Sequence, residues 1–377
     1  MMTRNERQDL SIKKWKEANC RASIIAATGT GKTRIALKCI SRVLNKNPSV
    51  KTVVIVPTRV LKDQWEKEIE EFFEGEILDV EVKVLKTASM KKFNCNFLIL
   101  DEAHTVAAIS LRTVFKNCNP TFILGLTATY ERLDGQEKEV LDKYCPPCDE
   151  ITLQEATDNG WLAPYNEYRI LVDVDLTEYN NANRSFMINF AVLNFDFNLG
   201  MMLCSNPIKL NQYAVKIGMK PNDLKKVVYA WNKALQFRKS FIINHPKKLE
   251  IAKKIIEARK DKKIITFNSS VKQCEEYGEG YIVHSKNTKK KNQAIIDEFS
   301  KMSSACLHSV KMLEAGLNVP DINVGIAVGF TSSKISAVQT RGRCLRFEPN
   351  KKAEFFTIIL KGTQEEKWAK KAAEGLS

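Results

Sequence analysis

The feature that most constrains this chain is a glycine-containing loop between a strand-like segment and a helix-like segment. Residues 23–40 read SIIAATGTGKTRIALKCI, in which an apolar run enters the loop and an amphipathic run leaves it. The backbone N–H groups of such a loop can surround a phosphate group, and the first turn of the following helix adds the positive end of its dipole. The stretch therefore predicts a phosphate-binding site.

The residue types in this loop indicate which ligand it takes. Lys32 would reach the terminal phosphates of a nucleotide, and Thr33 would coordinate Mg²⁺. The strict pattern GxxxxGK[ST] has glycine where this chain has Ala26, so the motif alone could be a chance match. The strand–loop–helix context argues against chance. The residues expected to contact the nucleotide are Thr28, Gly29, Thr30, Gly31, Lys32 and Thr33.

Short apolar runs of β type alternate with helical periodicity in two separate parts of the chain. This alternation is typical of parallel sheets with helices on both faces. We therefore expect an α/β fold with two doubly wound domains, at residues 1–164 and 246–377. Residues 165–245 are expected to form a linker or helical insertion, mostly helical from residue 178 onward.

The chain offers little support for a membrane or secreted protein. The first ten residues, MMTRNERQDL, are polar and do not read as a signal peptide. The most apolar stretch, 185–204, is interrupted by asparagines and an aspartate, so a buried helix is favoured over a membrane span. We expect a cytoplasmic protein, in the cytoplasm of the host cell if the source is a virus or phage. Compactness favours such a source.

The ten cysteines are scattered, and only Cys145 and Cys148 form a CxxC pair. A four-ligand zinc site would need a second pair at suitable spacing, so a loop with reduced thiols is the favoured interpretation.

The net charge of +15 is unevenly distributed along the chain. Residues 1–164 hold 24 lysines and arginines against 23 acidic residues, whereas residues 165–377 hold 35 against 21. A one-sided basic excess is the expected footprint of a polyanionic partner, above all nucleic acid. A merely solubilising surface is the alternative.

A second motif, FLILDEAH at residues 97–104, ends an apolar run in two carboxylates. Asp101 would hold Mg²⁺, and Glu102 would orient and deprotonate an attacking water. A pair of this kind is weak evidence alone, but it follows the phosphate loop within the same α/β block. The spacing of His104 from the two carboxylates suggests that its side chain contacts neighbouring motifs and does not bind a metal.

A third motif, LGLTATYERLDG, places Thr127 and Thr129 at the end of another strand. Hydroxyl groups there can carry hydrogen bonds from a nucleotide site to its surroundings. A simple turn is the alternative, and physical reasoning alone does not decide between them.

In this order, the motifs resemble those of the superfamily 2 helicases and translocases. AATGTGKT is similar to motif I, VPTRVLKDQW to Ia, LDEAH to II, GLTAT to III, EAGLNVP to V and QTRGRCLR to VI. The segment ITLQEATDNGWLAPY resembles one that follows motif III in XPB-like and phage UvsW-type branch-migration DNA helicases. This resemblance implies two tandem RecA-like P-loop NTPase domains, ATP and Mg²⁺ as cofactors, and DNA as partner.

The resemblance also assigns roles to residues at matching positions. Hydrolysis would involve Lys32, Asp101, Glu102, Gln339, Arg343 and Arg346, the two arginines reaching the γ-phosphate from the second domain. Gln8 would contact adenine, with Thr33 and Asp101 on Mg²⁺. His104, Thr127, Thr129 and Gly316 would couple the nucleotide site to the nucleic acid, whose backbone would contact Pro57, Thr58 and Arg59.

The chain departs from the family pattern at three further positions. Thr340 stands where motif VI often has arginine, Asn318 replaces a common aspartate of motif V, and Asn5 replaces the arginine that usually precedes Gln8. The last departure weakens the prediction of adenine recognition.

Together these features predict a monomeric, nucleic-acid-stimulated ATPase that moves on, remodels or unwinds double-stranded or branched DNA in recombination, repair or replication. An RNA helicase is the nearest alternative. A nucleic-acid-binding scaffold with a degenerate nucleotide site and a small-molecule P-loop kinase are the others. The kinase would leave the basic second half unexplained.

Overall fold

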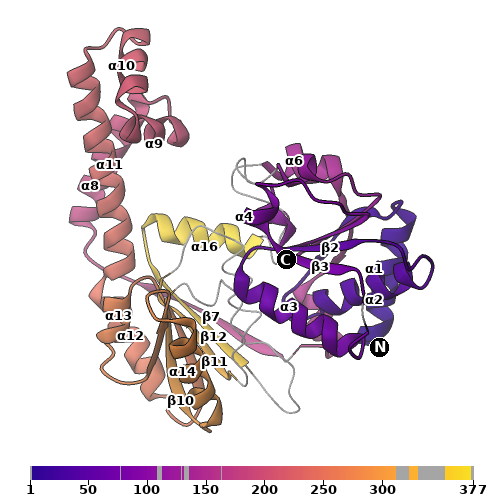
Figure 1. Cartoon of the computed structure of the whole chain (residues 1–377). Coiled ribbons are helices and arrows are strands. Elements are labelled where there is room, and N and C mark those ends of the chain that lie inside the picture. The colour runs from indigo at the N-terminus through magenta and orange to yellow at the C-terminus, as the bar shows by residue number, and fades with distance from the viewer. Residues whose placement is uncertain are drawn as a thin grey trace.

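The structure is a computed structural model that describes residues 2–76, 78–107, 113–128, 130, 136–162, 164–310, 322–329 and 353–374. Within these residues the strands form two six-stranded sheets, and every strand pairing is parallel. Figure 1 shows the sheets in two lobes, with a long helical arm extending from the second lobe. The predicted α/β fold with two tandem parallel-sheet domains is therefore confirmed.

The first domain holds its strands in the order β3-β2-β4-β5-β1-β6. The strands are β1 (Arg21–Ala26), β2 (Thr52–Val56), β3 (Val80–Val84), β4 (Phe97–Asp101), β5 (Phe122–Thr127) and β6 (Pro147–Ile151). The helical elements are α1 (Arg4–Glu17), α2 (Lys32–Leu44), α3 (Arg59–Phe72), α4 (Leu85–Ala88), η1 (Ala103–Thr105), α5 (Val114–Asn117), α6 (Gln136–Tyr144) and α7 (Leu153–Asp158).

Burial on both faces explains why the central strands are so apolar. Every residue of β2 and β4 is buried, as expected for inner strands of a parallel sheet covered by helices.

The sheet also brings backbones close together at Gly125 of β5. A Cβ atom built there would lie 2.1 Å from Oγ of Ser23 on β1, so this position accepts only glycine without rearrangement.

The second domain holds its strands in the order β7-β12-β11-β8-β10-β9. The strands are β7 (Tyr165–Val172), β8 (Lys263–Asn268), β9 (Tyr281–His284), β10 (Ala305–Val310), β11 (Val324–Ala327) and β12 (Ala353–Leu360). The helices that belong to this domain are α12 (Pro246–Glu257), α13 (Val271–Glu275), α14 (Lys289–Lys301) and α16 (Gln364–Glu374).

The start of the expected helical insertion is a strand of the second domain. Residues 165–172 were expected in the linker, but β7 pairs with all eight residues of β12, from Ala353 to Leu360. Because the partner strand lies far along the sequence, the alternation of local patterns gave no sign of this pairing. The second sheet therefore begins directly after the first domain and is interrupted by the arm.

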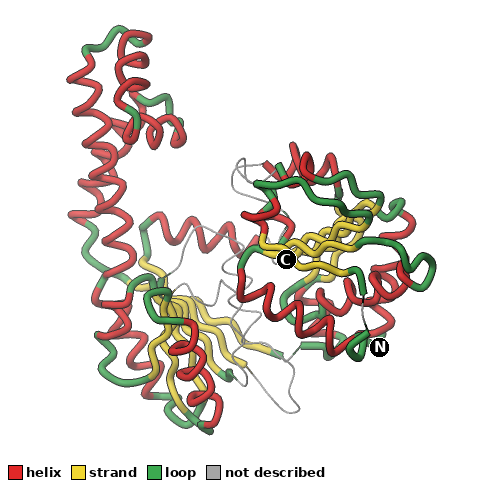
Figure 2. The backbone as a smooth tube through the Cα atoms, viewed as in Figure 1, coloured by secondary structure: helices red, strands yellow, loops and turns green. Residues whose placement is uncertain are grey.

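The arm consists of α8 (Thr177–Val192), α9 (Phe197–Ser205), α10 (Pro207–Lys216) and α11 (Pro221–Asn244). Figure 2 shows it as helices joined by short loops. It has a hydrophobic core of its own around Trp231, which is fully buried. A Cβ atom built on Gly200 would lie 2.7 Å from the Trp231 ring, so α9 approaches α11 closely there.

The apolar stretch 185–204 spans the end of α8 and most of α9. These two helices meet at 88°, and only as a pair do they reach the length and apolar character of a broken membrane span. Of the helices that the structure describes, none reaches that threshold alone.

The CxxC segment is only partly a loop, since Cys148 lies within strand β6. Cys145 and Cys148 are both free thiols, and burial raises the pKa of each to about 11. Both are therefore protonated at neutral pH, which makes them poor nucleophiles and poor metal ligands.

Candidate nucleotide site

The phosphate loop connects β1 to α2 through two glycines in the left-handed region. Gly29 has φ 89° and Gly31 has φ 94°, a backbone conformation that side chains with a Cβ rarely adopt. Between them, the Thr30 hydroxyl donates a hydrogen bond of 2.7 Å to the carbonyl of Ala27. Helix α2 begins at Lys32, directly after the loop, without a side-chain N-cap. Its free N–H groups are thus available to an anion.

Helix α1 forms the wall beside this loop. Its residues Arg4 and Gln8 both donate hydrogen bonds to the Thr30 carbonyl, at 3.1 Å from Nε and 3.2 Å from Nε2 respectively. Gln8 is buried, and its amide fills the space above Gly31, where a Cβ atom would lie 2.5 Å from Nε2. The structure therefore places Gln8 at the phosphate loop, and its predicted contact with adenine stays a prediction. The structure also places Arg4 there, which sequence reasoning missed.

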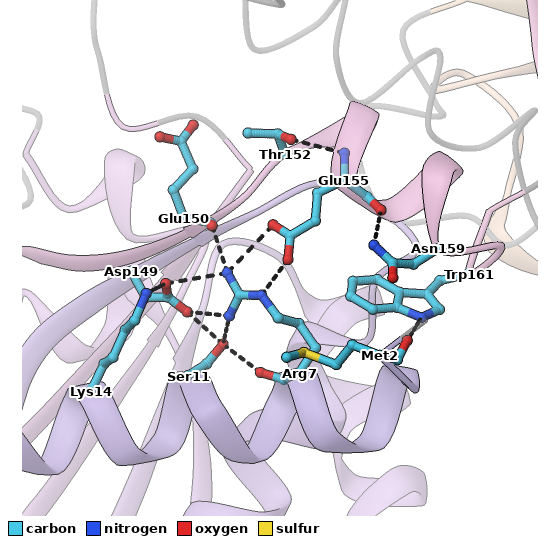
Figure 3. Close-up of polar contacts among 10 residues, drawn as sticks. All are labelled: Met2, Arg7, Ser11, Lys14, Asp149, Glu150, Thr152, Glu155, Asn159 and Trp161. Atoms are coloured by element: carbon cyan, nitrogen blue, oxygen red, sulfur yellow. Dashed lines mark hydrogen bonds and ion pairs between the residues drawn. The ribbon is translucent and has the colours of Figure 1, made fainter.

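Buried ion pairs fix α1 to the end of the first domain (Figure 3). Arg7 contacts the carboxylates of Asp149 on β6 and Glu155 on α7, each at 2.5 Å, and Ser11 and Lys14 also donate to Asp149 at 2.7 Å and 2.6 Å. Burial alone would raise the pKa of Asp149, but the hydrogen bonds from Arg7, Lys14 and Ser11 lower it below its usual value. We call the five residues the α1 clamp.

The α1 clamp was absent from the sequence analysis. Arg7 and Asp149 lie 142 residues apart, and neither belongs to a motif. The only local signal is the spacing of Arg7, Ser11 and Lys14, which lie on one side of α1 because they are three and four residues apart. The clamp matters for the site because it holds the helix that carries Gln8.

Asp101 of LDEAH is the last residue of β4, and Glu102 follows it; one strand, β5, separates β4 from β1, which leads into the phosphate loop. Asp101 is buried, and Nε1 of Trp65 donates a hydrogen bond of 2.9 Å to its Oδ2. Burial, followed by the negative charge of Glu102, raises the pKa of Asp101 to about 6. Glu102 adopts the left-handed conformation with φ 51°, which is unusual for a residue with a Cβ. This turn directs the chain away from the strand.

Lys32 and Glu102 bring the two motifs together. Nζ of Lys32 lies 3.8 Å from Oε1 of Glu102 and donates a hydrogen bond of 3.4 Å to the carbonyl of Ala26. Two buried oxygens here, Oγ1 of Thr28 and Oε2 of Glu102, have no hydrogen-bond partner among the described residues. Buried oxygens without partners are uncommon in native proteins and point to a bound polar ligand.

His104 and Thr127 connect LDEAH to the third motif. Nδ1 of the histidine lies 3.0 Å from Oγ1 of the threonine and 3.6 Å from Oε2 of Glu102. The structure thus joins these two expected coupling residues directly. Thr129, the other hydroxyl expected here, lies outside the described residues.

The residues expected to contact nucleic acid follow β2. Thr58 is the N-cap of α3, where its side chain accepts a hydrogen bond from the N–H of Leu61. Arg59 is exposed and Pro57 is half-buried. The remaining predicted residues lie outside the described part of the chain: Gly316, Gln339, Arg343 and Arg346.

These features fit a nucleoside triphosphate with Mg²⁺. The loop supplies N–H groups and Lys32 for phosphate oxygens, and Oγ1 of Thr28 in the loop is buried without a hydrogen-bond partner among the described residues. Within the described residues no three His, Cys, Asp or Glu side chains are grouped as a metal site. Mg²⁺ usually binds through one or two protein oxygens together with phosphates and waters, so such a group is not required. The fold and site define a P-loop NTPase with two parallel-sheet domains.

Comparisons with known proteins agree with this class. Residues 2–132 match the family described as type III restriction enzyme, res subunit, and residues 247–348 match the helicase conserved C-terminal domain. The DNA 3'-5' translocase XPB2 of Sulfurisphaera tokodaii is 24% identical over 389 residues, covering 97% of this chain and 83% of that protein. Putative helicase 22 of Sulfolobus islandicus filamentous virus is 23% identical, covering 93% and 63%.

A solved structure shows the same fold. The crystal structure of the Pyrococcus furiosus Hef helicase domain has a TM-score of 0.54 and 16% identity, and the alignment covers 97% of both chains. Both α/β domains of the chain are thus similar to those of superfamily 2 helicases and translocases. The chain is an ATPase of the helicase class.

Proposed function

We propose that this chain uses ATP hydrolysis to move along, remodel or unwind double-stranded or branched DNA. The observation that carries the proposal is the approach of Lys32 to Glu102 beside the glycine loop, which gathers the groups needed for phosphoryl transfer in one place. The relative named as a DNA translocase supports DNA as the polymer. Activity on branched DNA would suit recombination, repair or replication.

Each residue of the first domain has a defined role in this proposal. Lys32 would contact the β- and γ-phosphates, while Thr33 and Asp101 would hold Mg²⁺, an ion that supplies positive charge beside the phosphates when it is bound. Glu102 accepts the proton of the attacking water. His104 and Thr127 relay the state of Glu102 to the end of β5, through the contacts of 3.6 Å and 3.0 Å described above. Gln8 contacts the adenine.

The second domain completes the reaction in this proposal. Arg343 and Arg346 would contact the γ-phosphate from the second domain, and Gln339 would contribute near the attacking water. Because the two domains share one nucleotide, binding draws them together and product release separates them. Nucleic acid held at Thr58, Arg59 and the basic second half is then gripped alternately by each domain, mainly through its phosphates.

Replacing Lys32 by alanine tests the proposal. We expect Lys32→Ala to abolish DNA-stimulated ATP hydrolysis while DNA binding stays within about twofold, since the lysine contacts phosphate and not DNA. Lys46→Ala, at an exposed position shortly after α2, is the matched control and should keep full activity. ATPase and unwinding assays should compare single-stranded, duplex, forked and four-way DNA.

Two outcomes would contradict the proposal. Hydrolysis by the Lys32→Ala protein at the rate of the unmodified chain would remove the loop from the mechanism. Stimulation by RNA alone would favour the RNA helicase alternative, which is supported by a relative named as a putative ATP-dependent RNA helicase, from Methanocaldococcus jannaschii, at 22% identity.

A further inference from the structure

A second cavity lies where the helical arm joins the second domain. It has a volume of about 420 Å³, and its walls come from α8, α9 and α11 of the arm and from α16. Most of the lining is aromatic or aliphatic, including Phe186, Phe197, Leu235 and Trp368. The cavity therefore favours an apolar occupant. It shares no residue with the nucleotide site.

One charged group interrupts this apolar lining. Arg238 is only 9% exposed, and its Nε has no hydrogen-bond partner among the residues that the structure describes. Its Cζ lies 4.3 Å from the ring centroid of Phe186 and 5.8 Å from that of Tyr179. Within the described part of the chain, no carboxylate pairs with this guanidinium. Aromatic rings attract a guanidinium but offer its N–H groups no good acceptor, so its desolvation is not fully compensated.

The charged residues around the cavity also favour a negatively charged occupant. Lys239 also lines it, and none of the described lining residues is an aspartate or glutamate. Over the whole arm, residues 177–244, nine lysines and arginines stand against three acidic residues. A carboxylate placed in the cavity would therefore meet a buried, unpaired guanidinium within a positive field. Charge-assisted hydrogen bonds between these two groups are among the strongest in proteins.

We propose that this cavity binds an acidic, hydrophobic peptide segment of a partner protein. The segment would place one carboxylate on Arg238 and its flanking apolar side chains against Phe186, Leu235 and Trp368. Phe197 lines the cavity and is itself 48% exposed, so the apolar surface reaches outward from the cavity, and this suits an extended peptide better than a small molecule. A nucleobase would find few polar groups for its edges here, since Gln364 is the uncharged amide of the lining.

A bound segment would also connect the arm to the second domain. Helix α16 of the second domain closes the cavity against the arm, and a hydrogen bond of 2.9 Å from N of Gln364 on α16 to the hydroxyl of Tyr179 on α8 already joins them. An occupant that contacts Leu235 on α11 and Trp368 on α16 bridges the same joint. The partner would thus fix the arm against the domain while the nucleotide site remains free.

Binding of a defined peptide set to the full chain tests the proposal. Each fluorescent peptide has a central Asp or Glu between two residues chosen from Leu, Ile, Phe and Trp, and a matched peptide has Asn or Gln at the centre. By fluorescence anisotropy, we expect saturable binding of at least one acidic peptide and at least about tenfold weaker binding of its amide counterpart. Binding of no acidic peptide above its amide counterpart overturns the proposal.

Three variants separate this site from general charge attraction. Arg238→Met should weaken binding at least about tenfold, without a lower melting temperature, since it removes an unpaired buried charge. Gln364→Glu should block the peptide, because it supplies the missing carboxylate within the chain. Lys233→Met, at an exposed position on α11, should bind like the unmodified chain.

Contrary outcomes of these experiments are equally specific. Unchanged peptide binding by Arg238→Met overturns the proposal. The proposal is also overturned if Arg238→Met has a much lower melting temperature without peptide and Gln364→Glu binds the peptide as the unmodified chain does. Together these two results would assign Arg238 to packing of the arm. Displacement of the peptide by a single-stranded oligonucleotide, equally from the unmodified chain and from Lys233→Met, would instead assign the cavity to nucleic acid.

Discussion

At the residue scale, the nucleotide site is held together by polar groups that a nucleotide would have to reorganise. Lys32 lies 3.8 Å from Glu102, and Gln8 and Arg4 both donate to one carbonyl of the loop, that of Thr30. A bound γ-phosphate would compete with Glu102 for the lysine and so free the carboxylate to accept a proton. The carboxylate is then available for catalysis only when a phosphate is present.

Gly31 is the residue on which this arrangement depends most directly. Gly31→Ala should weaken nucleotide binding strongly, because the new methyl group would displace the Gln8 amide that lies 2.5 Å from its ideal position. The positive φ adds about 1–2 kcal/mol of backbone strain. Binding of a fluorescent ATP analogue and thermal melting measure the two effects separately.

Gly75→Ala is the matched control for this prediction. Gly75 also has a positive φ, of 78°, but no atom of the described residues lies within 4 Å of its ideal Cβ position. It should show the loss of stability without the loss of nucleotide binding. Equal nucleotide affinity in Gly31→Ala and Gly75→Ala would mean that Gln8 does not shape the site.

At the scale of elements, the phosphate loop depends on how α1 is docked. The α1 clamp anchors this helix to β6 and α7, and its buried charges are satisfied by one another. Buried pairs of this kind often add little net stability, yet removing one partner is costly because the other charge is left unpaired. The clamp therefore fixes a position more than it strengthens the fold.

Arg7→Met should lower the free energy of unfolding by about 3–5 kcal/mol, because Asp149 would lose its main buried partner. It should also raise the KM for ATP more than it lowers kcat, since Gln8 and Arg4 move with α1 while Lys32 and Glu102 do not. Chemical denaturation and steady-state ATPase kinetics measure these changes.

Two further variants complete this experiment. Lys13→Met, which removes a charge from the exposed face of α1, should change stability by less than about 0.5 kcal/mol. Arg7→Met combined with Asp149→Leu should recover part of the lost stability, because no buried carboxylate remains unpaired. A KM for ATP equal to that of the unmodified chain in Arg7→Met would show that the clamp does not position the site.

The second sheet contains a buried histidine that makes its stability depend on pH. His308 on β10 donates from Nε2 to the carbonyl of Glu279 at 2.9 Å, and its Nδ1 accepts from the Thr266 hydroxyl at 2.8 Å. Burial lowers the pKa of His308 to about 4, against an ordinary value of 6.5. The imidazole is thus neutral in the folded protein at neutral pH.

Stability should fall as the pH is lowered from 6.5 towards 4, because the unfolded histidine takes up a proton that the folded one does not. The contribution of neutral His308 to the free energy of unfolding is largest above pH 6.5. At most about 3 kcal/mol of it is lost between pH 6.5 and pH 4. His308→Gln can keep both hydrogen bonds and should remove this part of the slope. An equal pH dependence of unfolding in the variant and the unmodified chain would exclude His308 as the source.

At the scale of the whole molecule, the sequence predicted the structural features that short motifs and hydrophobic periodicity encode. The two parallel-sheet domains, the glycine loop between β1 and α2, and the carboxylates at the end of β4 all follow from short motifs and periodicity. Strand β7 did not, because its partner β12 lies more than 180 residues further along the chain. The α1 clamp was missed for the same reason, since Arg7 and Asp149 become neighbours only through the sheet order.

The proposal that one nucleotide serves both domains leads to the last prediction. Arg343→Ala should keep ATP binding within a few-fold, because Lys32, the loop N–H groups and Gln8 all belong to the first domain. Hydrolysis should fall by about a thousandfold or more, since an arginine that neutralises the transferred phosphoryl group acts mainly in the transition state. Single-turnover hydrolysis and equilibrium nucleotide binding separate the two quantities.

Comparison with Lys32→Ala distinguishes a catalytic arginine from a nucleotide-binding residue. Both variants should lack turnover, but only Lys32→Ala should also lose nucleotide affinity, because the lysine contacts the phosphates in the ground state as well. Loss of ATP affinity in a folded Arg343→Ala protein would make that arginine a binding residue. Normal turnover by Arg343→Ala would instead show that ATP hydrolysis does not need an arginine at position 343. The proposal that this residue couples hydrolysis to domain closure would then be wrong.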